Sequence, residues 1–145
     1  MYHYTESGLR GIWLANGYKE VETSEGKGVA FANLEGLHRA IAMDLLRYKP
    51  RLSGKEFRFI RQEMRFSQAR LAQMLGTTDQ AVARWEKGKT RVPKMADRFL
   101  RAFYRESAEG NAHIIEMVKR LNEIDQQAWE KRTYGLENNE WRVAA

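Results

Sequence analysis

The sequence contains no cysteine and only two prolines among its 145 residues. Without cysteine, disulfides and thiolate metal sites are excluded, and we expect neither a metal nor another cofactor. No apolar run approaches the ~18 residues that a membrane-spanning helix needs. The N-terminal stretch MYHYTESGLRG also lacks the basic-then-apolar pattern of a secretion signal. These absences predict a cytoplasmic protein with no membrane partner.

Groups that could carry catalysis are also scarce. The three histidines, His3, His38 and His113, are far apart in the sequence. The segment EGKG is too short and wrongly placed for a phosphate-binding loop, and no GxSxG nucleophile motif occurs. His38 lies beside the apolar stripe of a predicted helix, which favours a packed or surface side chain over a metal ligand. We therefore expect that the protein is not an enzyme.

What the sequence has in excess is positive charge, with a net charge of +6. The surplus is confined to residues 51–105, which carry 14 basic and 5 acidic side chains. Residues 1–50 carry six of each sign, and residues 106–145 carry five basic and eight acidic side chains. Charge concentrated in one segment is typical of a protein that binds a polyanion. A merely solvated surface is the alternative.

Periodicity and turn chemistry divide the chain into three parts, residues 1–50, 51–106 and 107–145. In the first part, short alternating runs predict two or three strands in one small sheet, around 12–14, 18–21 and 29–31. A sheet of this size is marginal by itself, so we expect it to pack on a helix.

An amphipathic helix is predicted directly after these strands. Apolar side chains at steps of three and four residues run from Leu34 to Tyr48. Asn33 stands where an N-cap is expected. Pro50 and the LSG that follows it predict the end of this helix and a linker to the second part of the chain.

Four short helical patterns follow in quick succession between residues 51 and 106. The first covers 54–64, and Ser67 is the expected N-cap of the second, which ends at Gly76. The third covers 79–87, and Pro93 marks the first turn of the fourth. Their apolar faces are Phe57, Ile60 and Met64; Leu71, Ala72 and Leu75; Val82 and Trp85; and Ala96, Phe99, Leu100 and Phe103.

The second and third of these patterns are two short helices joined by a turn that contains glycine, which is the helix-turn-helix arrangement. In such a unit the first helix crosses the DNA backbone and the second lies in the major groove. The helix at 79–87 has what this second role needs. Val82 and Trp85 supply an inner apolar face, whereas Gln80 and Arg84 are four residues apart and share an outer face.

Four residues at the start of this helix are predicted to contact bases, namely Thr78, Asp79, Gln80 and Arg84. Glutamine suits adenine and arginine suits guanine, each through two hydrogen bonds, and an aspartate can accept from cytosine. Thr78 could contact a thymine methyl group or serve only as the N-cap. Asp79 could serve only the helix dipole, and Arg84 could instead pair with Asp79 or Asp97.

Four further residues are predicted to contact phosphates: Gln68, Lys87, Lys89 and Arg91. Gln68 begins the crossing helix, whose N-terminal N–H groups favour the same anion. The three cations follow the far end of the second helix, with a solvated surface as the alternative for the lysines. Glu86 is expected to have an internal structural role, because phosphate would repel a carboxylate that faced it.

The stretch SQARLAQMLGTTDQAVARWEKGKTRVP resembles the Cro/phage-repressor, or xenobiotic-response-element (XRE), helix-turn-helix family. This resemblance covers roughly residues 54–106 and implies a five-helix lambda-repressor-like domain. The whole chain is then mostly α, with a small β-hairpin or sheet and a helix before the domain and a C-terminal helix after it. Members of the family work as dimers on palindromic operators. Positions that match the two sets of four residues above lie against bases and near phosphates, respectively.

The layout of the chain is also similar to MqsA-type antitoxins, in which an N-terminal module precedes such a domain. YTESGL, GIWLANGY and EGLHRAI come before LSGKEFRFIRQEMRFSQ in a similar order. The zinc-binding cysteine pairs of that family are missing here, which puts its zinc and its antitoxin activity in doubt.

The last predicted helix covers residues 108–130, with apolar positions 114, 117, 121, 124 and 128 in a two-heptad seam. This seam predicts either a homodimer contact or a cover for the domain's own core. The tail TYGLENNEWRVAA has no clear period and is read as frayed, with Trp141 as a possible anchor. The leading hypothesis is a repressor that binds double-stranded DNA as a homodimer. The alternative is an antitoxin that binds a toxin through residues 1–50 and represses its own operon.

Overall fold

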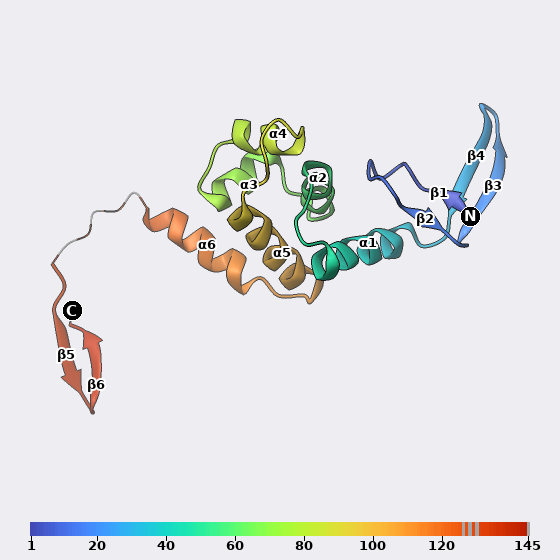
Figure 1. Ribbon diagram of the computed structural model, residues 1–145. Coiled ribbons are helices and arrows are strands. Elements are labelled where there is room, and N and C mark those ends of the chain that lie inside the picture. Colours follow the sequence, from blue (N-terminus) through green and yellow to red (C-terminus); the bar gives the residue numbers. More distant parts are fainter. Residues whose placement is uncertain (126, 128, 130, 145) are drawn as a thin grey trace.

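The computed structural model describes residues 1–125, 127, 129 and 131–144. A compact group of helices forms the middle of the molecule, with strands at both ends of the chain (Figure 1). The helices are α1 (Leu34–Tyr48), α2 (Gly54–Glu63), α3 (Gln68–Leu75), α4 (Asp79–Glu86), α5 (Lys94–Ala108) and α6 (His113–Ile124). This arrangement confirms the mostly α fold class. No helix of the described residues combines the length and apolar character that crossing a membrane requires.

The N-terminal strands form two separate antiparallel pairs, where the sequence predicted one small sheet. β1 (Tyr2–His3) pairs with β2 (Trp13–Leu14), and β3 (Tyr18–Thr23) pairs with β4 (Gly26–Phe31). Aromatic side chains join the two pairs: the ring of Tyr2 lies 5.3 Å from that of Tyr18 and 5.6 Å from that of Phe31. Because side chains rather than a shared ladder link the pairs, alternation along the sequence could not distinguish the two arrangements.

Tyr4 connects these strands to the helices. Its side chain is buried, and its hydroxyl lies 2.7 Å from Nε2 of His38 on α1. The other ring nitrogen of His38, Nδ1, lies 3.2 Å from a carboxylate oxygen of Glu63 at the end of α2. His38 is therefore a packed histidine, one of the two alternatives that the sequence left open. The role of residues 1–50 as a partner-binding module stays a prediction.

Helix α1 begins as predicted, because Asn33 Oδ1 accepts a hydrogen bond of 3.1 Å from the Gly36 N–H. The predicted linker after it is more ordered than its composition indicated. Leu52 is buried and its N–H donates to Asp97 on α5 at 2.7 Å. Ser53 and Glu56 form a capping box that starts α2.

The predicted helices between residues 51 and 106 are confirmed as α2 to α5, and their buried residues share one core. Helix α2 starts directly against the C-terminal end of α4. A Cβ placed on Gly54 would lie 2.1 Å from the Trp85 carbonyl oxygen. Two details differ from the sequence analysis. Pro93 is the N-cap of α5 rather than its first helical residue, and Phe99 is 42% exposed, stacked on buried Phe103.

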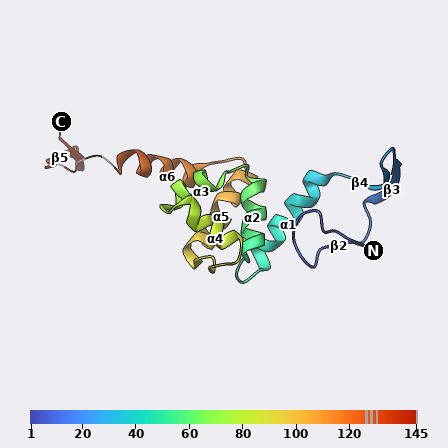
Figure 2. The ribbon, with the colours of Figure 1, turned by 90° about the horizontal axis from the view of Figure 1, so that it is seen from above.

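Helix α6 packs against α3 and α5 at one end of the group of helices (Figures 1 and 2). It is shorter than the predicted 108–130, and Ala128 of the predicted seam lies outside the described residues. Ile115 is buried, although it was not assigned to the seam. Met117, Leu121 and Ile124 are 57%, 52% and 39% exposed. The helix therefore covers its own domain with Ile115 and the partly buried Ile114 of the predicted seam, and it leaves the other three described seam residues exposed.

The reading of the tail as frayed is wrong. Residues Tyr134–Glu137 (β5) and Glu140–Val143 (β6) pair as an antiparallel hairpin. Asn138 and Asn139 form the turn with φ values of 51° and 63°. Asparagine adopts this conformation more readily than most residues, and two-residue hairpins require it. Trp141 is 71% exposed and does not anchor the tail to the described part of the chain.

Candidate nucleic-acid interface

The unit formed by α3 and α4 is held by local hydrogen bonds that the sequence predicted. Ser67 Oγ accepts from the Arg70 N–H at 3.0 Å and starts α3. Gly76 ends α3 with a φ of 72°, and the following Thr77 N–H donates to the Ala72 carbonyl. Thr78 Oγ1 accepts from the Ala81 N–H at 3.2 Å and starts α4. The turn between the helices is thereby fixed, which sets the angle at which α4 leaves the domain.

The inner face of α4 is anchored in the core. Val82 is fully buried, and Trp85 is nearly so, with its ring edge-on to that of Phe57 at 5.9 Å between centroids. Trp85 is therefore a core residue and not an exposed stacking platform. Burying two large side chains contributes about 1.5–3 kcal/mol each, so the outer face of α4 is presented by a firmly packed helix.

The outer face of α4 carries the polar residues predicted to contact bases. Thr78, Asp79, Gln80 and Arg84 are all exposed. Thr78 is also the N-cap, and one Asp79 oxygen accepts from the Gln80 N–H at 3.0 Å. The alternative that Arg84 pairs with Asp97 does not occur, because both Asp97 oxygens bind Leu52 and Arg101. Within the described residues Arg84 forms no ion pair.

Three predicted phosphate-binding cations follow α4 on a short, ordered connection. Lys87, Lys89 and Arg91 are all exposed. Gly88 adopts a φ of 75°, and the Lys89 N–H donates to the Arg84 carbonyl at 3.0 Å. These backbone constraints place the three cations just beyond the C-terminal end of α4.

Gln68, the fourth predicted phosphate-binding residue, is partly buried, and its amide donates to Glu86 at 3.0 Å. Glu86 also accepts from Nε and Nη2 of Arg61 at 2.7 and 2.8 Å, and Nη1 of Arg61 donates to the Phe66 carbonyl. The internal role predicted for Glu86 is thus confirmed. This network joins the end of α2, the start of α3 and the end of α4.

Sequence reasoning missed Arg61 and Arg70. Arg61 is buried on α2. A charged side chain is almost never buried unless it is paired, and here Glu86 is the partner. The position of Arg61 beside Phe57 and Ile60 on the apolar face was the available signal. Arg70 lies exposed in the first turn of α3, with its guanidinium 4.6 Å from the centre of the Phe66 ring. It adds a cation to the same side of the unit as the N-terminus of α3.

No group of three or more histidine, aspartate or glutamate side chains within the described ranges has the arrangement of a metal site. The exposed cations of the α3–α4 unit suit binding to an extended anion. The α4 helix has a packed inner face, a short polar outer face and cations beyond its C-terminal end. A helix that contacts bases in a groove of a nucleic acid needs these three features.

Comparison with known proteins agrees with this geometry. Residues 57–96 match a family model described as helix-turn-helix, and this match runs from the first turn of α2 to the first turn of α5. No curated protein and no solved structure matched the chain. A helix-turn-helix of this kind is a DNA-binding regulatory unit and not a catalytic one. Residues 57–96 are thus a helix-turn-helix of the Cro/phage-repressor (XRE) type, in a chain that is a DNA-binding transcription regulator.

Proposed function

We propose that the protein represses transcription by binding a palindromic operator as a dimer, with α4 of each protomer in a major groove. The observation that carries this proposal is the division of α4 into two faces. Val82 and Trp85 are buried, whereas Gln80 and Arg84 project from the outer face without an ion pair among the described residues. Bidentate contacts of these side chains with adenine and guanine would supply the specificity.

Phosphate contacts would come from both ends of the unit. Lys87, Lys89 and Arg91 lie beyond α4, and Gln68 opens α3. Because the Gln68 amide is held by Glu86, its position is fixed before DNA binds, and its second amide hydrogen is available for a phosphate oxygen. Such contacts set the register of the protein on DNA without reading its sequence.

The second protomer would dock on the exposed face of α6. Met117, Leu121 and Ile124 form a stripe of large apolar side chains with steps of four and three residues, which suits helix pairing. The buried Ile115 holds α6 to its own domain. Because α6 would contact both its own domain and the second protomer, it would fix the separation of the two α4 helices. This separation must match half-sites about 34 Å apart.

The experiment that tests the operator is in-vitro selection from a random pool of duplex DNA by the full chain. We expect a palindromic consensus whose half-sites are one helical turn apart. Enrichment of a single asymmetric site would contradict dimeric binding. Recovery of no consensus at all would contradict sequence-specific recognition.

Arg84→Ala is expected to weaken binding to the selected operator by about 1–3 kcal/mol and to relax preference at one base pair of each half-site. Among the described residues the guanidinium has no partner that its loss would leave unsatisfied. Fluorescence anisotropy with the operator and single-base variants measures both effects. Arg47→Ala, exposed on α1 and outside both proposed interfaces, is the matched control. Equal binding of Arg84→Ala and the parent protein to every sequence would contradict the proposal that Arg84 contacts a base.

A double variant, Met117→Gln with Leu121→Gln, is expected to weaken the dimer by two or more orders of magnitude. Each apolar side chain contributes about 1.5–3 kcal/mol when it is buried, and each occurs twice in a symmetric interface. Sedimentation equilibrium measures the dissociation constant. Lys119→Gln with Glu123→Gln, on the same helix but off the stripe, should leave it unchanged. An unaltered dimer in the first variant would remove α6 from the interface.

A further inference from the structure

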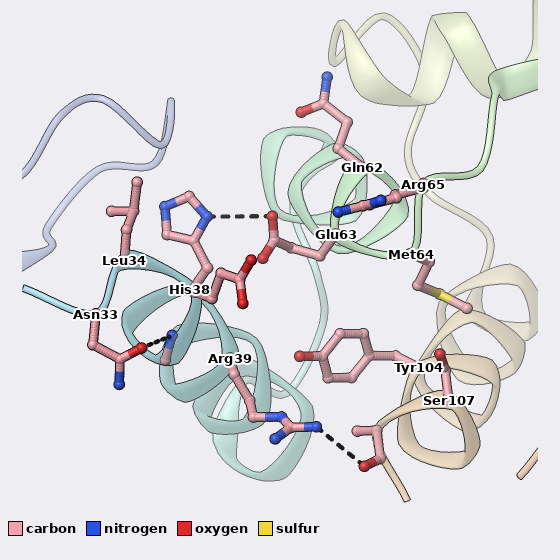
Figure 3. A pocket seen from close by; sticks show the side chains of 13 residues that line it. Asn33, Leu34, His38, Arg39, Gln62, Glu63, Met64, Arg65, Tyr104 and Ser107 are labelled. Carbon is pink, nitrogen blue, oxygen red and sulfur yellow. Dashed lines mark hydrogen bonds and ion pairs between the residues drawn. The ribbon is translucent and has the colours of Figure 1, made fainter. Parts of the chain in front are cut away.

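A pocket of about 650 Å³ lies between α1, α2 and α5, away from the outer face of α4 (Figure 3). Its walls come from the first turns of α1, the end of α2 and the last turns of α5. Three segments that are distant in the sequence therefore converge on it. The volume lies within the range of pockets that bind small molecules.

Tyr104 forms the floor of this pocket. The residue is only 7% exposed, and its hydroxyl points from α5 into the space between α1 and α2 (Figure 3). The hydroxyl lies within reach of the Arg39 guanidinium. Burial is the main cause that raises the pKa of Tyr104, and the Glu63 carboxylate adds to the shift, while nearby Arg39 opposes it. The hydroxyl thus keeps its proton and can donate it to an acceptor.

Charges of both signs line the pocket without neutralising one another. Arg39 and Arg65 contribute two positive charges, and Glu35 and Glu63 contribute two negative ones. No ion pair between described residues joins the two signs across the pocket. Arg39 donates one N–H to the Ala108 carbonyl at 3.2 Å, which orients its guanidinium and leaves other N–H groups free. Glu63 accepts a hydrogen bond from His38 through one carboxylate oxygen, and its other oxygen can accept from a ligand.

We propose that this pocket binds a free α-amino acid. The α-carboxylate would accept hydrogen bonds from Arg39 and the Tyr104 hydroxyl, and the α-ammonium would lie against Glu63 and Glu35. A lining with equal numbers of arginines and glutamates favours a ligand that carries both charges over a simple anion such as phosphate. Arginine is suited to the carboxylate because its planar N–H groups match the two oxygens.

The proposed ligand would touch the link between the helices and the N-terminal strands. Glu63 binds His38, and His38 binds Tyr4 of the strands. An ammonium group beside Glu63 would share its carboxylate with His38. Binding is therefore expected to shift the ring signals of His38 and Tyr4 in NMR spectra, although neither side chain contacts the α-carboxylate.

Isothermal titration of the full chain, without DNA, with each of the twenty amino acids tests the site. At least one is expected to bind, and its analogues that lack the amino group or the carboxylate should each bind at least tenfold more weakly. Tyr104→Phe should weaken binding about 5- to 10-fold, the effect of one hydrogen bond. Arg39→Gln should weaken it tenfold or more. Arg47→Gln, also exposed on α1 but outside the pocket, should have no effect.

Failure of all twenty amino acids to bind at about 10 mM, tenfold above the dissociation constant of a weak ~1 mM site, would overturn the proposal. Equal binding of the analogue without the amino group would show a simple anion site, which also contradicts it. Binding that Tyr104→Phe and Arg39→Gln both leave unchanged would place the ligand elsewhere. Because DNA is absent from these titrations, failure here would leave operator binding untouched, and operator binding by the two variants can be measured separately.

Discussion

Arg61→Met is expected to lower the free energy of unfolding by about 3–5 kcal/mol. The substitution removes one partner of a buried ion pair whose distances are 2.7 and 2.8 Å. Glu86 would then remain buried with only the Gln68 amide as a donor, and the Phe66 carbonyl would lose its hydrogen bond. Since small domains are stable by only about 5–15 kcal/mol, this is a large fraction of the total.

Urea denaturation followed by circular dichroism measures this loss. The second variant is the double replacement, Arg61→Met with Glu86→Leu, which leaves no uncompensated charge in the core. We expect it to be more stable than Arg61→Met alone, because replacing both members of a buried pair by apolar residues costs far less than removing one. A double variant no more stable than Arg61→Met alone would contradict this coupling of the two charges. Lys55→Met, exposed on the same helix, is the control.

The function of this network is to place α4 relative to α2 and α3. The ion pair between Arg61 and Glu86 joins α2 to α4. Because Gly54 has no side chain, α2 can start against the end of α4. Loss of the ion pair should therefore affect DNA binding through stability and the position of α4, whereas loss of Arg84 should affect base preference. The two kinds of variant therefore distinguish residues that position α4 from residues proposed to contact bases.

The parts of the fold that the sequence predicted are those with local causes. Ser67 and Thr78 cap the helices that follow them, and Gly76 ends α3 in a left-handed conformation. Each of these features depends on a few neighbouring residues. The exposed outer face of α4 also follows from local periodicity, since residues four apart share one side of a helix.

The parts that the sequence did not predict depend on distant partners. Arg61 is buried only because Glu86, 25 residues later, neutralises it. The composition around Leu52 predicts a linker, but Asp97 accepts its N–H from 45 residues away. Helix α6 has apolar residues on more than one side, and which side is covered depends on α3 and α5. Periodicity identifies an apolar face, but the neighbouring elements decide which face is buried.

The hairpin at the C-terminus was missed for a different reason. Asn138 and Asn139 form the turn, and the apolar residues Tyr134, Leu136, Trp141 and Val143 alternate with Gly135 and charged residues on the two strands. The strands are only four residues long, which gives alternation little statistical weight. The paired asparagines were the more specific signal.

Affinity for the operator is expected to fall about 10³-fold between 50 and 200 mM salt, the largest effect that the proposed interface implies. Lys87, Lys89 and Arg91 provide three exposed cations in each protomer. With about six phosphates neutralised by a dimer, log affinity should fall with log salt at a slope of about −5. Anisotropy titrations at several salt concentrations give this slope directly.

Lys89→Ala is the variant that separates phosphate contact from base reading. It should reduce the slope by about 2 for a dimer, since each lost contact removes about 0.9, and weaken all sequences alike. Arg84→Ala should instead change the preference among sequences. Lys119→Ala on α6 removes the same charge away from the interface and should leave the slope unchanged. If Lys119→Ala flattened the slope as much as Lys89→Ala, net charge rather than contact beyond α4 would determine the binding. The cations after α4 would then lose the role assigned to them.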